Sequence, residues 1–151
     1  MARAMGRDIG RASDRRGQAL SDADYEALAE FRYALRRFLN RSAAAARAAR
    51  LTPQQHQALL AIKGHTCGAI SIGGLAEKLM VRHHSAGELV ERLRQAGLVE
   101  RQPDPADRRR VLIFVSTRGH GLLAALSTVH LEEVRLIQPA LRRLLAKLDA
   151  G

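Results

Sequence analysis

The chain has 151 residues, enough for one domain with a buried core, and it is 46% hydrophobic but only 3% aromatic. A chain so rich in Leu and Ala favours helices packed through aliphatic side chains. The formal net charge of +10 suits a polyanionic partner, either nucleic acid or an anionic membrane surface. The single cysteine, Cys67, excludes an internal disulfide and fits a reducing cytoplasm, and no apolar run approaches the roughly 18 residues of a membrane span.

The first 20 residues are basic, with five arginines against two aspartates, and they lack the apolar stretch of a secretory signal. We interpret residues 1–20 as a flexible basic tail, with a DNA-gripping arm as the alternative. From Ser21 to about Ala49 a helix is predicted, because apolar residues recur at helical spacing after an acidic first turn. The apolar residues of this helix are Tyr25, Leu28, Phe31, Leu35, Phe38 and Leu39.

Three further helices are predicted between residues 51 and 97. The first begins at Thr52, because Thr52 as N-cap, followed by Pro53 and Gln55, forms a strong helix start. Ser71 caps the second helix, and Gly97 ends the third in the position that favours a left-handed residue. The predicted order is a helix to near Gly64, a loop from His65 to Ile70, a short helix to Leu79, a turn near Met80 and Val81, and a helix to Gln95 with Ala86, Leu89, Val90 and Leu93 facing inward.

The pattern changes at Leu98. Residues 98–101 and 111–115 predict two short strands, and the charged loop between them contains two prolines, which exclude a helix. Thr117 starts a last long helix, which Pro139 should interrupt before a final helical segment. Four helices, a hairpin and two helices are the order of a winged helix-turn-helix, so the predicted fold is mainly α with a small β-hairpin wing.

Several short motifs follow one another between Ser71 and Gly119. The charged loop holds an Asp-x-Arg element at Asp107 and Arg109, and the closing strand ends in a Ser-Thr-x-Gly pattern. The other motifs are Ile72–Leu79, Leu89–Leu93 and Gln95–Arg101. In this order they resemble the MarR family of bacterial transcription regulators, and the helix order extends the resemblance to about residues 21–149. The resemblance implies a ligand-responsive homodimeric repressor that binds a pseudo-palindromic operator, with an activator or an unresponsive architectural regulator as the alternatives.

The helix that ends at Gln95 is the expected recognition helix, because its outward side chains are short, polar or cationic while its other face packs inward. The family often has Ser-Thr-Val-Thr-Arg at its start, whereas Glu88 here stands where a basic residue is common. His83 and His84 are adjacent and point about 100° apart on a helix, so DNA contact is favoured over a shared metal ion. The residues predicted to contact DNA here are Arg82, His83, His84, Ser85, Glu88 and Arg92.

The expected wing presents three successive arginines, Arg108, Arg109 and Arg110, at or just past its tip. A guanidinium there can enter the narrow minor groove, where the negative potential is greatest. In the family the aspartate of Asp-x-Arg pairs with its arginine, which implies that Asp107 orients Arg109. An ordinary exposed ion pair, worth about 0–1 kcal/mol, is the alternative.

The apolar stripes of the terminal helices are too extensive for one small wing domain to cover, so a homodimer is predicted. In the family the first and last helices of two subunits intertwine, and small anionic aromatic molecules often bind between that interface and the DNA-binding lobe. A share in such a pocket is conceivable for Arg32, Arg36 or His56, without an assignment. The predicted dimer-interface residues are Tyr25, Leu28, Phe31, Leu141, Leu144, Leu145 and Leu148.

The predicted organisation is a tail (1–20), an N-terminal dimerisation helix (21–50), a DNA-binding lobe (51–116) and C-terminal dimerisation helices (117–151). No catalytic residue, metal or cofactor is expected, because the chain lacks a Gly-rich phosphate loop, Cys-x-x-Cys, His-Glu-x-x-His and a nucleophile elbow. We interpret Cys67 as a passive thiol. The other histidines are too scattered to predict a metal site and are interpreted as structural or exposed: His56, His65, His120 and His130. The remaining alternative is a basic amphipathic module for a membrane surface or a partner, which leaves the Arg-rich wing without a role.

Overall fold

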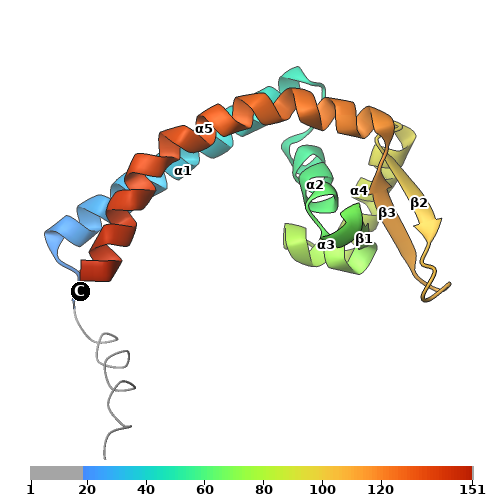
Figure 1. The fold of residues 1–151 in the computed structure, drawn as a ribbon, viewed down its shortest axis with the longest axis horizontal. Helices are drawn as coiled ribbons and strands as arrows, with labels where there is room; N and C mark the ends of the chain where they lie inside the picture. The colour runs from blue at the N-terminus through green and yellow to red at the C-terminus, as the bar shows by residue number, and fades with distance from the viewer. Residues whose placement is uncertain (1–18, 151) are drawn as a thin grey trace, which may run out of the picture.

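The computed structural model describes residues 19–150, except for the side chains of residues 128, 148 and 150. It consists of a long two-helix arm and a smaller mixed lobe, set at an angle to each other (Figure 1). The predicted tail lies almost wholly outside the described residues. The elements are α1 (Asp22–Ala48), α2 (Pro53–Lys63), a 3-10 turn (Thr66–Gly68), β1 (Ala69–Ser71), α3 (Ile72–Leu79), α4 (His83–Gln95), β2 (Val99–Pro103), β3 (Val111–Val115) and α5 (Thr117–Ala150).

The helix starts follow from local capping, as predicted. Thr52 and Gln55 form a capping box at α2, in which each side chain accepts a hydrogen bond from the other residue's backbone N–H. Ser21 caps α1 in the same way, and the Ser71 hydroxyl accepts from the third residue of α3. These caps satisfy N–H groups that have no partner inside a helix, so the boundaries were accessible from the sequence.

The sheet of the lobe has three antiparallel strands in the order β1-β3-β2, one more than predicted. The segment expected to be a loop up to Ile70 ends in β1, whose Ala69 pairs with Phe114 and whose Ser71 pairs with Leu112. A strand of three residues gains its hydrogen bonds from a partner more than 40 positions away, so its own sequence gives little signal. β2 and β3 form the predicted hairpin, with Val99 opposite Val115.

The lobe encloses a continuous aliphatic core beneath α3, α4 and the sheet. The side chains with the least exposure come from every layer: Leu59, Ile62, Ile70, Leu75, Val90, Leu93 and Ile113. Gly97 follows α4 with φ of 71°, as expected, and Met80 adopts a left-handed conformation between α3 and α4 with φ of 53°. These two turns fix the direction in which α4 leaves and enters the core.

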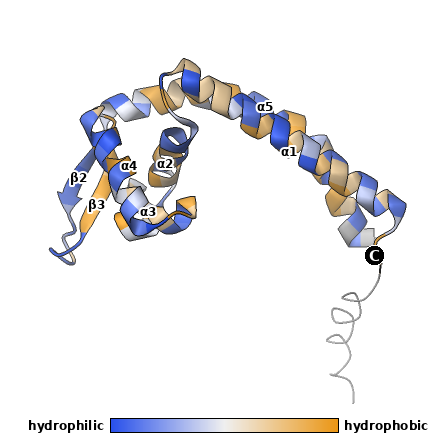
Figure 2. Cartoon of the chain, turned by 180° about the vertical axis from the view of Figure 1, so that it is seen from behind, coloured by the Kyte–Doolittle hydropathy of each residue, from blue (hydrophilic) through white to orange (hydrophobic). Residues whose placement is uncertain are grey.

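The arm is an antiparallel pair formed by α1 and α5, which run side by side over most of their length (Figures 1 and 2). The predicted interruption at Pro139 is wrong, because α5 continues through it as one helix of 34 residues. Proline removes one backbone hydrogen bond, at a cost of about 3 kcal/mol, and packing against α1 can offset such a loss. An ion pair of 2.8 Å between Arg143 Nη1 and Glu30 Oε2 also joins the helices. Within residues 19–150, no helix has the length and apolar character required to cross a membrane.

Candidate nucleic-acid interface

Helix α4 separates a buried face from a polar one, as the sequence predicts. Ala86, Leu89, Val90 and Leu93 are at most 3% exposed. The outward residues Arg82, His83, His84, Ser85, Glu88 and Arg92 are all exposed. No side chain caps the start of α4, and a Cβ at Gly87 would meet no atom within 4 Å. The first two turns of α4 are therefore open to an incoming surface.

Glu88 lies between His84 and Arg92 on this polar face. Its Oε1 lies 3.3 Å from His84 Nε2, and its Oε2 lies 3.7 Å from Arg92 Nη2, one helical turn away on either side. Exposed pairs of this kind contribute only about 0–1 kcal/mol, so a stronger partner can displace them. The acidic residue that departs from the family pattern therefore does not leave an unbalanced negative charge on α4.

A second ion-pair group, which the sequence did not reveal, ties α4 to the wing. Glu91 accepts hydrogen bonds from Arg94 Nη2 at 2.7 Å and Nε at 3.1 Å, and Arg101 Nη2 of β2 lies 3.5 Å away. The hydrogen bond from Arg94 is the main reason that the pKa of Glu91 lies below its ordinary value, with the charges of Arg94 and Arg101 adding to it. Arg94 and Arg101 thus already have an anionic partner inside the lobe.

The wing is held by two aspartates that accept hydrogen bonds from backbone N–H groups. Asp104 is 8% exposed, its Oδ1 accepts from the N–H of Ala106 at 2.9 Å, and its Oδ2 lies 3.7 Å from Arg110 Nε. Asp107 Oδ1 accepts from the backbone N–H of Arg109 at 3.0 Å. The contact between Asp107 and Arg109 therefore fixes the backbone of the turn, whereas the side-chain ion pair of the wing joins Asp104 to Arg110.

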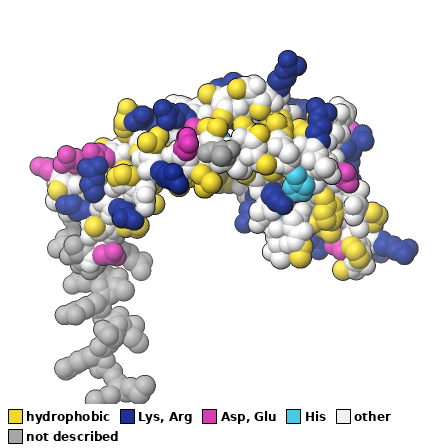
Figure 3. All heavy atoms as spheres, turned by 45° about the horizontal axis from the view of Figure 1, so that its top comes forward, with side chains coloured by type: hydrophobic (Ala, Val, Ile, Leu, Met, Phe, Trp, Pro, Cys, Tyr) yellow, Lys and Arg dark blue, Asp and Glu magenta, His cyan; other side chains and the backbone are white. Residues whose placement is uncertain are grey.

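Arg108 and Arg109 differ from Arg92, Arg94, Arg101 and Arg110, which all form ion pairs. Both are exposed at the end of the wing, and within the part of the chain that is described neither forms an ion pair; the same holds for the exposed Arg82 before α4. A guanidinium without an internal carboxylate keeps its full charge for an external anion. On the face shown in Figure 3, basic side chains are spread over both arm and lobe, so ion pairing separates the wing-tip arginines from their paired neighbours better than charge does.

The base of the wing is joined to the end of α4 and the start of α5 through Ser116. Its hydroxyl donates to the Gly97 carbonyl at 2.7 Å and accepts from the N–H of Gly119 at 3.1 Å. Its own N–H donates to the Leu98 carbonyl at 3.0 Å. A Cβ at Gly119 would overlap the Leu98 carbonyl oxygen and lie 2.7 Å from Val115 Cγ1. The Ser-Thr-x-Gly pattern is therefore required by close packing of α5 on the lobe.

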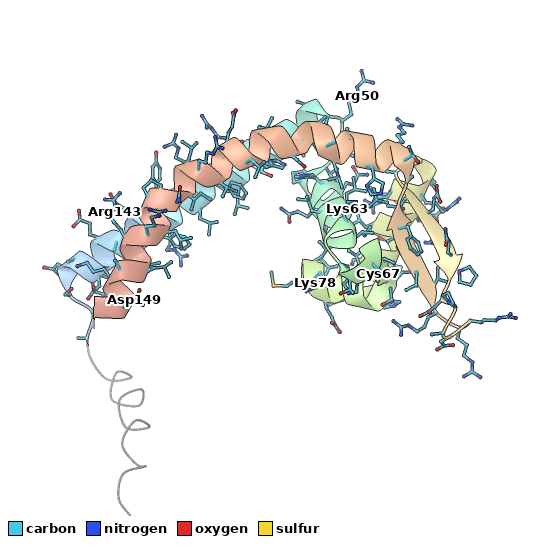
Figure 4. All side chains as sticks on the ribbon, viewed as in Figure 1. Arg50, Lys63, Cys67, Lys78, Arg143 and Asp149 are labelled. Carbon is cyan, nitrogen blue, oxygen red and sulfur yellow. The ribbon has the colours of Figure 1, made fainter. Side chains whose placement is uncertain are left out.

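The remaining candidates include an exposed thiol and a histidine pair. Cys67 is exposed in the turn before β1 (Figure 4). His56 and His130, which the sequence left scattered, meet between α2 and α5 with their Nε2 atoms 3.1 Å apart. No group of three or more His, Cys, Asp or Glu side chains suited to a metal ion occurs within the described residues.

The predicted dimer residues lie on the arm, and several large ones are exposed. Tyr25 is 58% exposed, Leu141 39% and Leu145 47%, while Leu28, Phe31 and Leu144 are half-buried between the helices. The side chain of Leu148 lies outside those described. The exposed leucines form an apolar surface along a helix pair that the lobe does not cover (Figure 2).

A hairpin that follows a helix-turn-helix and packs on its core defines the winged helix class. Residues 51–110 match the model of the MarR family. The chain is 32% identical over 85 residues to an HTH-type transcriptional regulator of Bacillus subtilis, YsmB, and 40% identical over 58 residues to one of Mycobacterium leprae. These matches cover 56% and 38% of this chain, and 57% and 41% of the relatives, so the chain spans about half the length of the curated relatives it matches.

Solved structures extend the likeness of fold to the arm. AbsC, a MarR family transcriptional regulator from Streptomyces coelicolor, superposes with a TM-score of 0.67 at 19% identity over 88% of this chain and 91% of AbsC. The MepR–DNA complex of S. aureus gives 0.56 at 20% identity (76% and 91%). NadR in complex with 4-hydroxyphenylacetate gives 0.65 at 22% identity (88% and 92%). These likenesses show the fold of the chain, and the match to the MarR family model is confined to residues 51–110.

Proposed function

We propose that the protein is a sequence-specific regulator that binds double-stranded DNA through α4 and the wing. The observation that carries this proposal is the exposed pair Arg108 and Arg109, whose side chains form no ion pair among the described residues, at the end of a wing that extends from the same lobe as the exposed polar face of α4. An α-helix fits the major groove, and a guanidinium at a hairpin tip fits the minor groove. The likeness of the fold to MepR in its DNA complex supports this placement of α4 in the major groove and of the wing in the minor groove.

The proposal includes a homodimer built from the arms. Exposed apolar patches of this length on a helix pair are uncommon in monomers and mark interaction surfaces. A two-fold dimer presents two equivalent recognition helices, so its operator should be roughly palindromic with half-sites about 10–10.5 base pairs apart. The protein would then act as a repressor by occupying that operator.

Selection of bound duplexes from a random pool tests the assignment of α4. The wild type should select a pseudo-palindrome, and the double variant Ser85→Ala, Glu88→Ala should select a different motif, because short side chains on this helix face base edges. Arg108→Ala serves as the matched control: it should weaken all duplexes evenly and keep the motif, since it meets phosphate or the degenerate minor groove. An unchanged motif in the double variant would show that α4 does not recognise bases.

A salt titration separates this function from membrane binding. Duplex DNA should bind with a steep dependence on salt, because each phosphate contact releases counterions, whereas vesicles of anionic lipid should bind weakly. Tight binding to vesicles with no binding to DNA would favour the basic amphipathic module instead.

We also propose that a small anionic aromatic molecule weakens operator binding. The support is the resemblance to NadR, which was solved with 4-hydroxyphenylacetate. A panel of hydroxylated benzoates and phenylacetates, titrated against the protein bound to its selected duplex, should contain at least one compound that lowers affinity. Benzyl alcohols of similar size serve as uncharged controls.

A further inference from the structure

Two buried side chains, His56 and Glu133, and the partly buried His130 between them form a continuous chain between the lobe and the arm. His56 of α2 is 1% exposed, and its Nε2 lies 3.1 Å from His130 Nε2 of α5. His130 Nδ1 in turn lies 3.3 Å from Glu133 Oε2, and Glu133 is 4% exposed. The two rings lie 4.6 Å apart between centroids and are tilted by 36°. The contact joins residues 74 positions apart at the place where α2 meets α5.

The hydrogen bonds of this chain limit how many protons it can hold. Glu133, as a carboxylate, accepts from His130 Nδ1–H, so one proton must lie between the two facing Nε2 atoms. Two states satisfy this condition: both imidazoles neutral with His56 donating, or His130 positive and donating to a neutral His56. If both imidazoles are positive, two N–H groups and two like charges face each other at 3.1 Å.

The charged groups around the pair do not relieve that repulsion fully. On α5 the neighbours are Glu133 and, at the edge of the adjoining hollow, Glu132; from α1 the cation Arg41 lines the same hollow as Glu133. Burial is the main reason that the pKa of His56 lies below its ordinary 6.5, and the charge of His130 lowers it further. Glu133 compensates one positive imidazole, so a second has no buried counter-ion among these neighbours.

We infer that His56, His130 and Glu133 form a joint of positioning residues that holds the lobe at a fixed angle to the arm. Protonation of both imidazoles breaks the contact between the two rings and so releases this joint. The inference rests on the proposed function, because in a dimer the angle of each lobe sets the spacing of the two recognition helices. Above about pH 6.5 the contact is complete. As the pH falls below that value, the unfolded or detached chain binds more protons than the native joint does, so stability is lost.

The first test needs no DNA. Thermal unfolding of the full chain, measured from about pH 8 to pH 5, should show a loss of melting temperature below about pH 6.5 in the wild type. His56→Gln replaces the titrating ring with an amide that still donates to His130, so it should flatten that loss. His120→Gln, an exposed histidine of the same helix α5, should keep the wild-type profile. His130→Gln is the second variant, used if His56→Gln does not fold.

The second test measures DNA affinity over the same pH range. It uses a background with His83→Gln and His84→Gln, because protonation of those exposed residues should strengthen DNA binding as the pH falls toward about 6. In that background affinity should fall about tenfold between pH 7.5 and pH 5.5, and His56→Gln should remove most of this fall.

The two tests separate the two ideas. If the wild type and a folded His56→Gln or His130→Gln variant show the same dependence of melting temperature on pH, the inferred joint is wrong, regardless of the result of the DNA-binding test. A flattened melting profile with no binding of duplex DNA at any pH keeps the joint and overturns the proposed function. Equal pH dependence of DNA affinity with and without His56 overturns the coupling of the joint to binding.

Discussion

The lobe and the arm solve the problem of burying apolar surface in different ways. In the lobe, Leu59, Ile62, Leu75 and Leu93 have no measurable exposure, because helices and sheet enclose them from several sides. Along α1 only Ala27, Ser42 and Ala46 are buried, and large side chains of both arm helices remain open to solvent. A two-helix pair has one inner seam and two outer faces. The lobe therefore has a complete core of its own, whereas the arm leaves large apolar side chains exposed, which the proposed homodimer would cover.

Leu145→Asp should dissociate the proposed dimer at the arm and leave the lobe folded, and this is the largest expected effect. Burying a leucine contributes about 1.5–3 kcal/mol, and a symmetric dimer loses two such contacts while gaining two desolvated charges. Sedimentation at micromolar concentration should change from about twice the 16.6 kDa chain mass to the chain mass itself. Leu60→Asp is the matched control, because Leu60 is similarly exposed, at 40%, but lies on α2 in the lobe. A wild type that sediments as a monomer would contradict the proposal that a second copy of the chain covers the apolar side chains of the arm.

Gly119→Ala should destabilise the lobe by about 1–3 kcal/mol, because the added methyl group overlaps the Leu98 carbonyl oxygen and presses on Val115. Gly121→Ala, two residues further along α5, meets no atom within 4 Å and should stabilise the helix by about 0.5–1 kcal/mol. Denaturant unfolding of both variants measures the difference. Equal stability of the two would mean that α5 is not closely packed at its start.

Arg109→Ala should cost about 1–3 kcal/mol of DNA binding and leave dimer mass and stability unchanged. Fluorescence anisotropy over a salt series should also show a slope reduced by about one phosphate contact per subunit. Arg94→Ala removes the same charge from an arginine that is already paired with Glu91, so its effect should be clearly smaller. If Arg94→Ala weakens binding as much as Arg109→Ala, net charge rather than position governs affinity.

Asp107→Ala and Asp107→Asn sharpen the role of the wing turn, with the smallest effect. The alanine variant loses the acceptor for the N–H of Arg109, so the turn loosens and DNA binding should weaken by about 0.5–1.5 kcal/mol. The asparagine variant keeps an acceptor oxygen and removes a negative charge, so it should bind as well as the wild type or better. Tighter binding by Asp107→Ala would show that charge outweighs the turn.

Local signals in the sequence predicted the helix starts at Thr52 and Ser71, the glycine stop at Gly97 and the two-faced character of α4. Each depends on residues within one or two turns of one another. The errors arose where distant packing decides the outcome. β1 exists because β3 pairs with it, and α5 continues through Pro139 alongside α1. The meeting of His56 with His130 has no local signature for the same reason, and Asp104 gave no sign that it, rather than Asp107, would pair with an arginine side chain.

Ser116 has a mechanical consequence for the whole molecule. Because the Ser116 hydroxyl and N–H hold together the end of α4, the segment after it and the third residue of α5, we expect the first turn of α5 to move as one rigid body with α4. Any bending between arm and lobe must therefore take place further along α5. The start of the long helix α5 is thus fixed to the lobe that carries the proposed DNA-binding surface, while the rest of α5 can transmit any bending to the arm. Hydrogen exchange at the Gly119 amide should accordingly follow the core of the lobe rather than the rest of the arm.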